Sequence, residues 1–331
     1  MPDPRLSVSL PYWQDRDPMD ALLVAEAADK LGYDRLWLGE MATFDAFALA
    51  TAVGQAPGRI PLCIGPLAVD VRTPATIAIG VASVAALTGR AVDIALGTSS
   101  TVVVKDWHGR ERRRTAVHLE ESAHIVRQLL DGEKGDFDGE IERIRGYRLR
   151  LPAPPQGLRP ELIVAAFGDR ALAAAARTAD RVVLNLVTPT QVARCVARIK
   201  EFAAEAGRAT PKISVWVTAA ADPTPDMLHT LRRGVVGYLR APGYDAMFEE
   251  AGFGDVVRLA HGGAHPREVL AAVPDELPAT VGMFGDAVTL ANRLTAYRDA
   301  GADEVVIVPV STSEDPAAQH TLEILAGIEH G

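Results

Sequence analysis

The sequence contains few cysteines and few lysines, and each shortage argues against a class of protein. Cys63 and Cys195 are the only cysteines in 331 residues, which excludes a disulfide framework or a zinc cluster and fits a reducing compartment. Five of the 34 basic residues are lysines, at positions 30, 105, 134, 200 and 212. A Schiff-base aldolase needs a lysine at the end of a barrel strand. None of the five is clearly there, and Lys105 is the nearest.

Long apolar runs and an excess of positive charge are also missing. The most apolar stretch, Ala75 to Leu87, has about 13 residues, whereas a membrane-spanning helix needs about 20. The first residues, MPDPRLSVSLPYW, lack the basic and then apolar segments of a signal peptide. The formal charge of −9 disfavours binding to nucleic acid or to an anionic membrane. We expect a cytoplasmic protein that acts on a small molecule, with no nucleic-acid or membrane partner.

What the sequence does contain is a regular alternation of short apolar runs with segments of helical period. The eight runs are residues 6–10, 35–39, 60–69, 91–96, 162–167, 181–186, 213–219 and 304–310. Eight parallel strands, each followed by a helix, are what a (β/α)8 TIM barrel needs. We predict one α/β domain over residues 1–331, with an insertion at about 241–284 near the seventh strand. A doubly wound open sheet is the structural alternative.

Three segments depart from this alternation. Residues 98–110 lack a regular period, and residues 137–155 alternate apolar and polar side chains around a turn, as in a surface hairpin. The insertion is rich in Gly and Pro, and we expect two or three short helical patches there. Its apolar side chains either cover a ligand as a lid or anchor the insertion to the barrel: Tyr244, Met247, Phe248, Phe253 and Phe284. Substrate choice is expected to lie in this insertion.

In a barrel, ligands bind where the strands end at their carboxyl side. These positions hold no histidine pair for a metal-dependent hydrolase, and His261 and His265 lie in a Gly-rich segment without a helical frame, so we expect no metal. A glycosidase needs two carboxylates, and only Glu40 qualifies. The stretches GTSS (97–100) and AAFGDR (165–170) could admit a phosphate through backbone N–H groups and a helix N-terminus. Each is also compatible with an ordinary turn.

Several segments together resemble the luciferase-like monooxygenases and, within them, the oxidoreductases that use the deazaflavin coenzyme F420. The matching segments are AADKLGYDRLWLGE (27–40), residues 59–100, VVVKDWHG (102–109), VAAFGDRALAAAARTADRVVLNLVTP (164–189) and FGDAVTLANRLTAYRDAGADEVVIVPV (284–310). The resemblance implies a luciferase-like barrel and hydride chemistry at a flavin-shaped cofactor. It also implies a homodimer in solution, which is the usual assembly of the family.

The same resemblance implies where the cofactor binds. A backbone bulge in the third strand, often with a non-proline cis peptide, would back the ring near Leu67, Ala68 and Val69. The phosphate would lie near Thr98, Ser99 and Ser100 and at the helix opening formed by Phe167, Gly168, Asp169 and Arg170. Glu40 matches an acidic residue near the ring. These positions form the predicted cofactor site.

The sequence departs from the family where a histidine commonly follows the acidic residue, because Met41 stands there. His108 is the nearest replacement as a catalytic group beside Glu40, although a loop-capping histidine is an equal interpretation. Trp13, Trp107 and Asn185 are expected on the substrate side of the mouth, or else as loop anchors and strand-end hydrogen-bond partners.

We predict hydride transfer between F420 and a small organic substrate, because a deazaflavin carries hydride and reacts poorly with oxygen. One alternative is a two-component monooxygenase that uses FMN as its cofactor. Another is a barrel that binds flavin without catalysis, since the histidine after Glu40 is absent.

Overall fold

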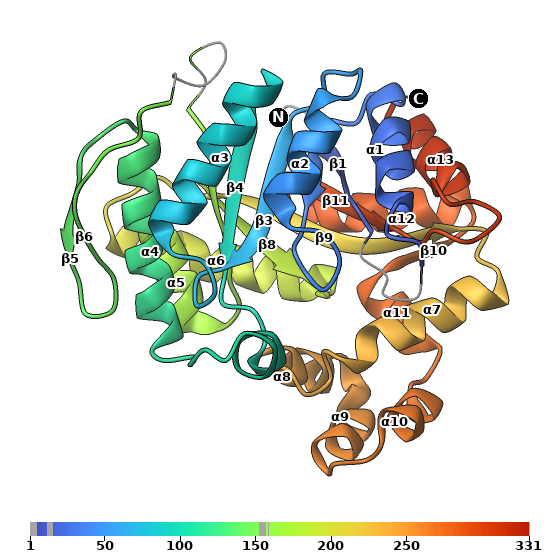
Figure 1. The fold of residues 1–331 in the computed structure, drawn as a ribbon. Coiled ribbons are helices and arrows are strands. Elements are labelled where there is room, and N and C mark those ends of the chain that lie inside the picture. The colour runs from blue at the N-terminus through green and yellow to red at the C-terminus, as the bar shows by residue number, and fades with distance from the viewer. Residues whose placement is uncertain (1–4, 12–15, 152–156, 158, 331) are drawn as a thin grey trace.

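The computed structural model describes residues 5–11, 16–151, 157 and 159–330, and its centre is a closed barrel of eight parallel strands (Figure 1). The barrel strands are β1 (Arg5–Ser9), β2 (Leu36–Leu38), β3 (Leu62–Ala68), β4 (Val92–Gly97), β7 (Leu162–Ala165), β8 (Arg181–Asn185), β9 (Lys212–Ala221) and β11 (Glu304–Pro309). Strand β11 pairs with both β1 and β9, and β9 also pairs with β8, which closes the ring. The predicted (β/α)8 barrel is therefore confirmed, and the open sheet is wrong.

Helices follow the strands and surround the barrel. They are α1 (Asp20–Lys30), α2 (Ala46–Gln55), α3 (Pro74–Thr88), α4 (Thr115–Leu130), α5 (Gly168–Thr178), α6 (Pro189–Glu205), α7 (Pro225–Val236), α12 (Ala287–Asp299) and α13 (Gln319–His330). Helices α3, α6 and α7 share one start: a threonine caps the first turn and a proline follows it, at Thr73, Thr188 and Thr224. The threonine oxygen accepts an otherwise unpaired N–H, and proline needs no partner there.

The predicted surface hairpin is confirmed, with bounds nearer the amino terminus than expected. Strand β5 (Gly135–Asp138) pairs antiparallel with β6 (Arg143–Tyr147). The turn between them is held by the Glu121 carboxylate of α4, which accepts N–H groups from Glu140, Ile141 and Glu142. The hairpin is thereby fastened beside the amino end of α4.

The segment at 241–284 is more helical than its Gly and Pro content suggested. It comprises α8 (Tyr244–Phe248), the π-helical η3 (Glu249–Phe253), α9 (Gly254–His261), α10 (Pro266–Ala272), α11 (Glu276–Val281) and the start of β10 (Met283–Gly285), which pairs with the end of β9. These helices share a small core with α7, in which Phe248 and Leu277 are fully buried. Met247 and Phe248 are thus anchors rather than lid surface, and α9 and α10 project at the lower right of Figure 1.

Buried charges close the amino end of the barrel. Arg181 is 1% exposed and Glu304 is fully buried, with 3.5 Å between Arg181 Nη1 and Glu304 Oε2. Arg35 lies 2.9 Å from Glu161, and the hydroxyl of Ser7 donates to Glu304. Burial works to raise the pKa of Glu304, but the two guanidinium groups outweigh it and hold that pKa below its usual value.

Above this charged layer the barrel interior is apolar. Trp37 and Trp216 pack edge to face with ring centroids 5.6 Å apart, and Cys63, Val183 and Val306 fill the space around them. The floor is therefore solid, which leaves the opposite end of the strands as the place for a ligand. No helix in the described part of the chain is both long and apolar enough to cross a membrane.

Candidate active site

The carboxyl ends of the strands form a mouth whose floor is kept low by small side chains. Gly97 ends β4, and a Cβ built there would lie 3.2 Å from the Cβ of Pro66 and 3.6 Å from that of Ala165. A larger side chain at position 97 would therefore fill the mouth or push its neighbours apart. Glu40, Thr98, Phe167 and Asn185 follow or end their strands around this floor, in the strand order that the sequence predicts.

The irregularity in β3 lies nearer the amino terminus than expected. The register between β3 and β4 shifts between Ile64 and Leu67, not at Leu67–Val69. The cis peptide that the structure records is Gly65–Pro66, so the expected non-proline cis bond is also wrong. Proline has no N–H to donate to the neighbouring strand, which explains why pairing breaks at Pro66. Leu67 and Val69 pack into the core between barrel and helices, whereas Ala68 is partly exposed.

Glu40 is held by an arginine that the sequence did not single out. Arg72 Nε donates to Glu40 Oε2 at 2.9 Å, and its Nη2 donates to Glu40 Oε1 and to Asp45. The N–H of Ala46 also donates to Glu40 Oε1, at 3.2 Å. Both carboxylate oxygens of Glu40 therefore have partners, in a site where Glu40 and Arg72 are only 21% and 22% exposed. This geometry holds the Glu40 carboxylate in one orientation at the mouth.

The electrostatics of this cluster favour the charged forms of Arg72 and Asp45. Hydrogen bonds from Arg72 to Glu40, which outweigh the effect of burial, raise the pKa of Arg72 further above its usual value. Partial burial works to raise the pKa of Asp45, but N–H donors of Ala48 and Phe47 and the Arg72 guanidinium lower it below the usual range. Arg72 also lies over the ring of Phe47, 5.0 Å from its centroid. The single positive charge of Arg72 thus balances only one of the two carboxylates, Glu40 and Asp45.

The loop after β4 carries the features of an anion site. Ser99 has a positive φ of 51°, and Ser100 Oγ accepts the N–H of Val103 at the start of the π-helical segment η1 (Val102–Trp107). Arg112 Nη2 donates to Thr98 Oγ1 at 3.3 Å, while its Nε is buried and has no partner among the described residues. A buried guanidinium donor without a partner fits a phosphate oxygen. Arg112 was missed from the sequence, although the run RERRR (110–114) was a visible signal.

The start of α5 faces the same part of the rim, because β4 and β7 are neighbours in the barrel. Gly168 adopts the left-handed conformation with a φ of 67°, and Phe167 before it supplies no side-chain cap. The first N–H groups of α5 are therefore without a side-chain acceptor in the helix cap. Asp169 pairs with Arg198 of α6 at 2.8 Å, so its carboxylate is already committed. Arg170 is exposed and pairs with no described residue.

An aromatic cluster covers the rim between β7 and β8, the fifth and sixth strands of the barrel. The ring of Tyr244 lies 4.7 Å from that of Phe167 and 4.8 Å from that of Tyr238. Asn185 Nδ2 donates to the Tyr244 hydroxyl at 3.1 Å. Burial raises the pKa of Tyr244 above its usual value, so the phenol stays protonated. Tyr244 thus ties the insertion to the mouth and gives Asn185 a structural partner.

The remaining predicted site residues lie on exposed parts of the chain or outside the described residues. Trp107 is 47% exposed at the end of η1. His108 follows η1, and its backbone N–H donates to Val103 O at 3.2 Å. No hydrogen bond or ion pair joins His108 to Glu40, both of which the structure describes. Trp13 lies outside the described residues.

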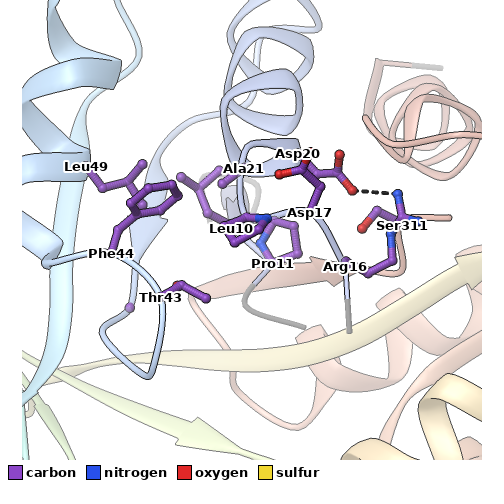
Figure 2. Close-up of a pocket in the computed structure, with 12 residues that line it drawn as sticks. Leu10, Pro11, Arg16, Asp17, Asp20, Ala21, Thr43, Phe44, Leu49 and Ser311 are labelled. Carbon is purple, nitrogen blue, oxygen red and sulfur yellow. Dashed lines mark hydrogen bonds and ion pairs between the residues drawn. The ribbon is translucent and has the colours of Figure 1, made fainter. Parts of the chain in front are cut away.

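A small cavity opens at the other side of the mouth, between the ends of β1, β2 and β11 (Figure 2). Its apolar wall includes Leu10 and Phe44, and its polar side includes Ser311, which is 3% exposed and whose Oγ has no partner among the described residues. Arg16 spans this side, with Nη2 2.6 Å from Asp20 and 2.7 Å from the Thr312 carbonyl. The cavity adjoins Gly39 rather than the loops that follow β4 and β7.

A buried histidine links the hairpin to the mouth. His118 of α4 lies 2.9 Å from Asp70, which follows β3, and 2.8 Å from Glu142 in the hairpin turn. Its side chain is 10% exposed. Burial works to lower the pKa of His118, but its two carboxylate partners outweigh that and raise it to about 9. The imidazolium therefore holds two acidic segments together.

The raised pKa of His118 makes part of the stability pH-dependent. A folded-state pKa of about 9 lies above the ordinary 6.5, so the contribution is complete below pH 6.5 and lost as the pH rises through 9. Wild type is expected to lose about 1–2 kcal/mol of unfolding free energy over that interval beyond what His118→Gln loses, after allowance for solvent screening. Urea unfolding of both proteins below pH 6.5 and above pH 9 measures this, and parallel pH profiles would contradict it.

Comparison with known proteins identifies a family whose model matches most of the chain. The family model for luciferase-like monooxygenases matches residues 7–304. An uncharacterized Mycobacterium tuberculosis protein is 31% identical over 167 residues, which is 50% of this chain and 57% of that protein. A second M. tuberculosis protein, provisionally assigned as a coenzyme F420-dependent oxidoreductase, is 26% identical over 153 residues, 46% of this chain and 42% of the other. The chain spans about half the length of the curated relatives it matches.

Solved structures of similar fold include enzymes with either cofactor. The F420-dependent tetrahydromethanopterin reductase of Methanopyrus kandleri superposes with a TM-score of 0.82 over 99% of both chains, at 19% identity. An F420-dependent secondary alcohol dehydrogenase gives 0.80 over 98% of both chains, at 18% identity. The oxygenating constituent of 3,6-diketocamphane monooxygenase from Pseudomonas putida, solved with FMN, gives 0.71 over 98% of this chain and 96% of its own, at 18% identity.

Proposed function

Because the chain belongs to the luciferase-like monooxygenase family, we propose that it is an oxidoreductase that transfers a hydride between coenzyme F420 and a small organic substrate. The observation that carries the proposal is the anion site at strand four, where Arg112 and Thr98 stand beside the low floor at Gly97. A planar cofactor with a phosphate needs both features side by side. The cytoplasmic location and the homodimer stay predictions from the sequence.

Two observations favour F420 over FMN. The F420-dependent enzymes superpose with TM-scores of 0.82 and 0.80, against 0.71 for the FMN-bound monooxygenase constituent. In addition, Met41 replaces the histidine that luciferase-type flavin enzymes tend to keep after the acidic residue. When bound, a deazaflavin supplies hydride transfer without oxygen chemistry, because carbon replaces the reactive N5. The shared fold and Met41 support this choice of cofactor, and the use of F420 is our proposal.

The residues of this chain divide the work of binding between them. Thr98, Arg112 and the N–H groups that open α5 would hold the phosphate. Gly97 and Ala165 leave room for the ring, and Ala68 lies on the strand predicted to back it. The Phe167 and Tyr244 rings exclude water from the rim beside β7.

Hydride transfer to or from a carbon bonded to oxygen also moves a proton, and the structure constrains which group handles it. When the hydride leaves an alcohol carbon, the hydroxyl proton passes to a base; the reverse reaction needs a proton donor. Glu40 has both oxygens engaged, so it acts here as a fixed charge that orients Arg72. The ring of His108 makes no hydrogen bond to a described residue, and His108 remains the predicted proton-handling group.

Arg112→Gln is expected to weaken cofactor binding by about 10- to 100-fold, because a hydrogen bond to a charged group contributes about 1.5–3 kcal/mol. Arg113→Gln is the matched control, since that neighbouring side chain is exposed and pairs with Glu111. It is expected to change affinity less than about twofold. Fluorescence titration with F420 measures both variants. Equal affinities for Arg112→Gln and wild type would remove Arg112 from the cofactor site.

The function is tested by anaerobic turnover with a panel of small alcohols and ketones. We expect at least one alcohol to reduce oxidised F420, or one ketone to reoxidise the reduced form, with no need for oxygen. The second candidate, an FMN-dependent monooxygenase, is favoured by the likeness to the diketocamphane enzyme. It predicts the opposite result: product forms only with reduced FMN and oxygen, and F420 stays unchanged.

A further inference from the structure

A short turn after β3 connects two parts of the candidate site. It covers residues 69–72, and we call it the β3 turn. The N–H groups of Val71 and Arg72 both donate to the Ala68 carbonyl at 3.0 Å. The backbone of the turn therefore fixes the place of Arg72 relative to the end of β3. Arg72 in turn binds Glu40, so a shift of the β3 turn also moves the charged pair at the mouth.

The β3 turn carries a buried carboxylate that faces away from solvent and toward α4. The side chain of Asp70 is 2% exposed, and its Oδ1 lies 2.9 Å from His118 Nδ1. Asp70 Oδ2 is buried and has no hydrogen-bond partner among the described residues. His118 is also the only ion-pair partner that the described part of the chain gives Asp70. A buried carboxylate needs such a partner, because burial without one is costly.

His118 is itself held from the other side by the surface hairpin. Its Nε2 lies 2.8 Å from Glu142, whose N–H donates to Glu121 Oε2 at 2.8 Å. Glu121 stands on α4, as His118 does, so the hairpin and the helix are fastened to each other. Figure 1 shows β5 and β6 at the outer edge of the molecule beside α4. The imidazole thus links the hairpin to the β3 turn.

The charge of His118 is controlled by few groups. Asp70 and Glu142 are the acidic side chains within ion-pair distance of it among the described residues. Burial works to lower the pKa of His118, but these two carboxylates raise it to about 9. Helix α3 has no charged side chain, and Arg170 and Asp136 are exposed. Other charged side chains on or packed against α4 have their own partners: Arg177 with Glu120, Asp169 with Arg198, Asp93 with Arg35, Asp138 with Arg143, and Arg114 with Glu140.

We propose that His118 is a positioning residue for cofactor binding, which holds the β3 turn, and with it Arg72, in the arrangement that the mouth needs. This role rests on the proposed function, because the affinity for F420 is what it changes. Without the imidazolium, Asp70 keeps a buried negative charge that no cation balances, and the β3 turn is drawn toward water. The hairpin side of the barrel then controls binding at the mouth without touching the ligand.

The first measurement needs no cofactor. Amide hydrogen exchange, followed by mass spectrometry of peptides that cover residues 69–72, reports the N–H groups bonded to the Ala68 carbonyl. In His118→Gln this exchange is expected to be about tenfold faster than in wild type, because a hydrogen bond between charged groups is lost. Asp70→Asn keeps the shape of the side chain and an acceptor for His118, so its effect should be smaller, about threefold.

The matched control is His124→Gln, the same substitution on the same helix. His124 is exposed and packs on the ring of Phe137 in the hairpin, with 5.0 Å between the ring centroids. It forms no ion pair with any described residue. Exchange of the β3 turn and affinity for F420 should stay within about twofold of wild type in this variant.

The second measurement is fluorescence titration of the full chain with F420. At pH 7, His118→Gln is expected to bind about tenfold more weakly than wild type, a difference of about 1.4 kcal/mol. The affinity of wild type should fall toward that of the variant as the pH rises through 9, where the imidazolium loses its proton. His118→Gln should lack this step. Adding Asp70→Asn to His118→Gln should weaken binding no further, because both act through one contact.

The possible failures are distinguishable. Equal F420 affinities of His118→Gln and wild type would overturn the positioning role and leave the proposed function standing, whether or not exchange of the β3 turn is faster. Unchanged exchange in His118→Gln would show that the β3 turn does not depend on the imidazolium, and would overturn the role as well. Additive losses in the double variant would contradict action through Asp70. Absence of F420 binding by wild type would overturn the proposed function, and with it the role of His118.

Discussion

Replacing Glu304 with leucine is expected to lower the free energy of unfolding by about 3–5 kcal/mol, which is typical of breaking a buried ion pair. Glu304 is fully buried at the amino end of the barrel, where Arg35 and Arg181 both face it. Without this carboxylate the two guanidinium groups share only the partners that remain, Glu161 above all. Urea unfolding at neutral pH measures the loss.

Two further variants make the result interpretable. Glu304→Gln keeps one acceptor oxygen, for either the Ser7 or the Ser214 hydroxyl, and fills the same space without the charge, so its loss should be smaller than that of Glu304→Leu. Glu120→Gln removes a surface partner of Arg177 and should cost at most about 1 kcal/mol. If Glu304→Leu proves as stable as Glu120→Gln, the charged layer does not hold the barrel floor together.

Glu40→Ala is expected to lower kcat/KM for F420-dependent turnover by about 100-fold, a loss comparable to removing one group that stabilises charge at a reaction centre. The carboxylate fixes Arg72 at the mouth through two hydrogen bonds. Without it, Arg72 retains Asp45 and the ring of Phe47 and is drawn away from the strand end. Steady-state kinetics with the substrate found in the anaerobic panel measures the loss.

Asp45→Asn is the control for this effect, because it removes the more exposed partner of Arg72 and leaves the Glu40 contacts in place. Its kcat/KM should fall less than about threefold. Glu40→Gln keeps an oxygen that accepts from Arg72, so it should retain more activity than Glu40→Ala without moving the pH profile. A pH profile that loses its acidic limb in Glu40→Gln would instead make Glu40 the proton-handling group.

The order of strands and helices was predictable because each barrel strand carries a short, mostly apolar run. The runs before Glu40, Thr98 and Gly168 end within a few residues of β2, β4 and β7, so the strand-end residues were found. Threonine followed by proline stands at three helix starts, so this local signal is also readable in the sequence. Local chemistry along the chain was sufficient for these features.

What failed depends on contacts between distant segments. The break in β3 was expected near Leu67 to Val69 from the resemblance to the family. The structure puts it at Pro66, which has no N–H to donate to β4. The turn of π-helix at Val102–Trp107 has no apolar period of its own. Arg72 and Arg112 could be identified only from the structure. Their partners Glu40 and Thr98 lie 32 and 14 residues away from them in the sequence.

The most direct test of the account is a paired equilibrium titration of the purified chain with F420 and with FMN under identical conditions. The proposed anion site at Arg112 would accept either phosphate, but Met41 favours the deazaflavin. We expect F420 to bind about 100-fold more tightly than FMN, a difference of about 2.7 kcal/mol. Tight binding of FMN with no binding of F420 would contradict the proposal that this barrel is an F420-dependent oxidoreductase.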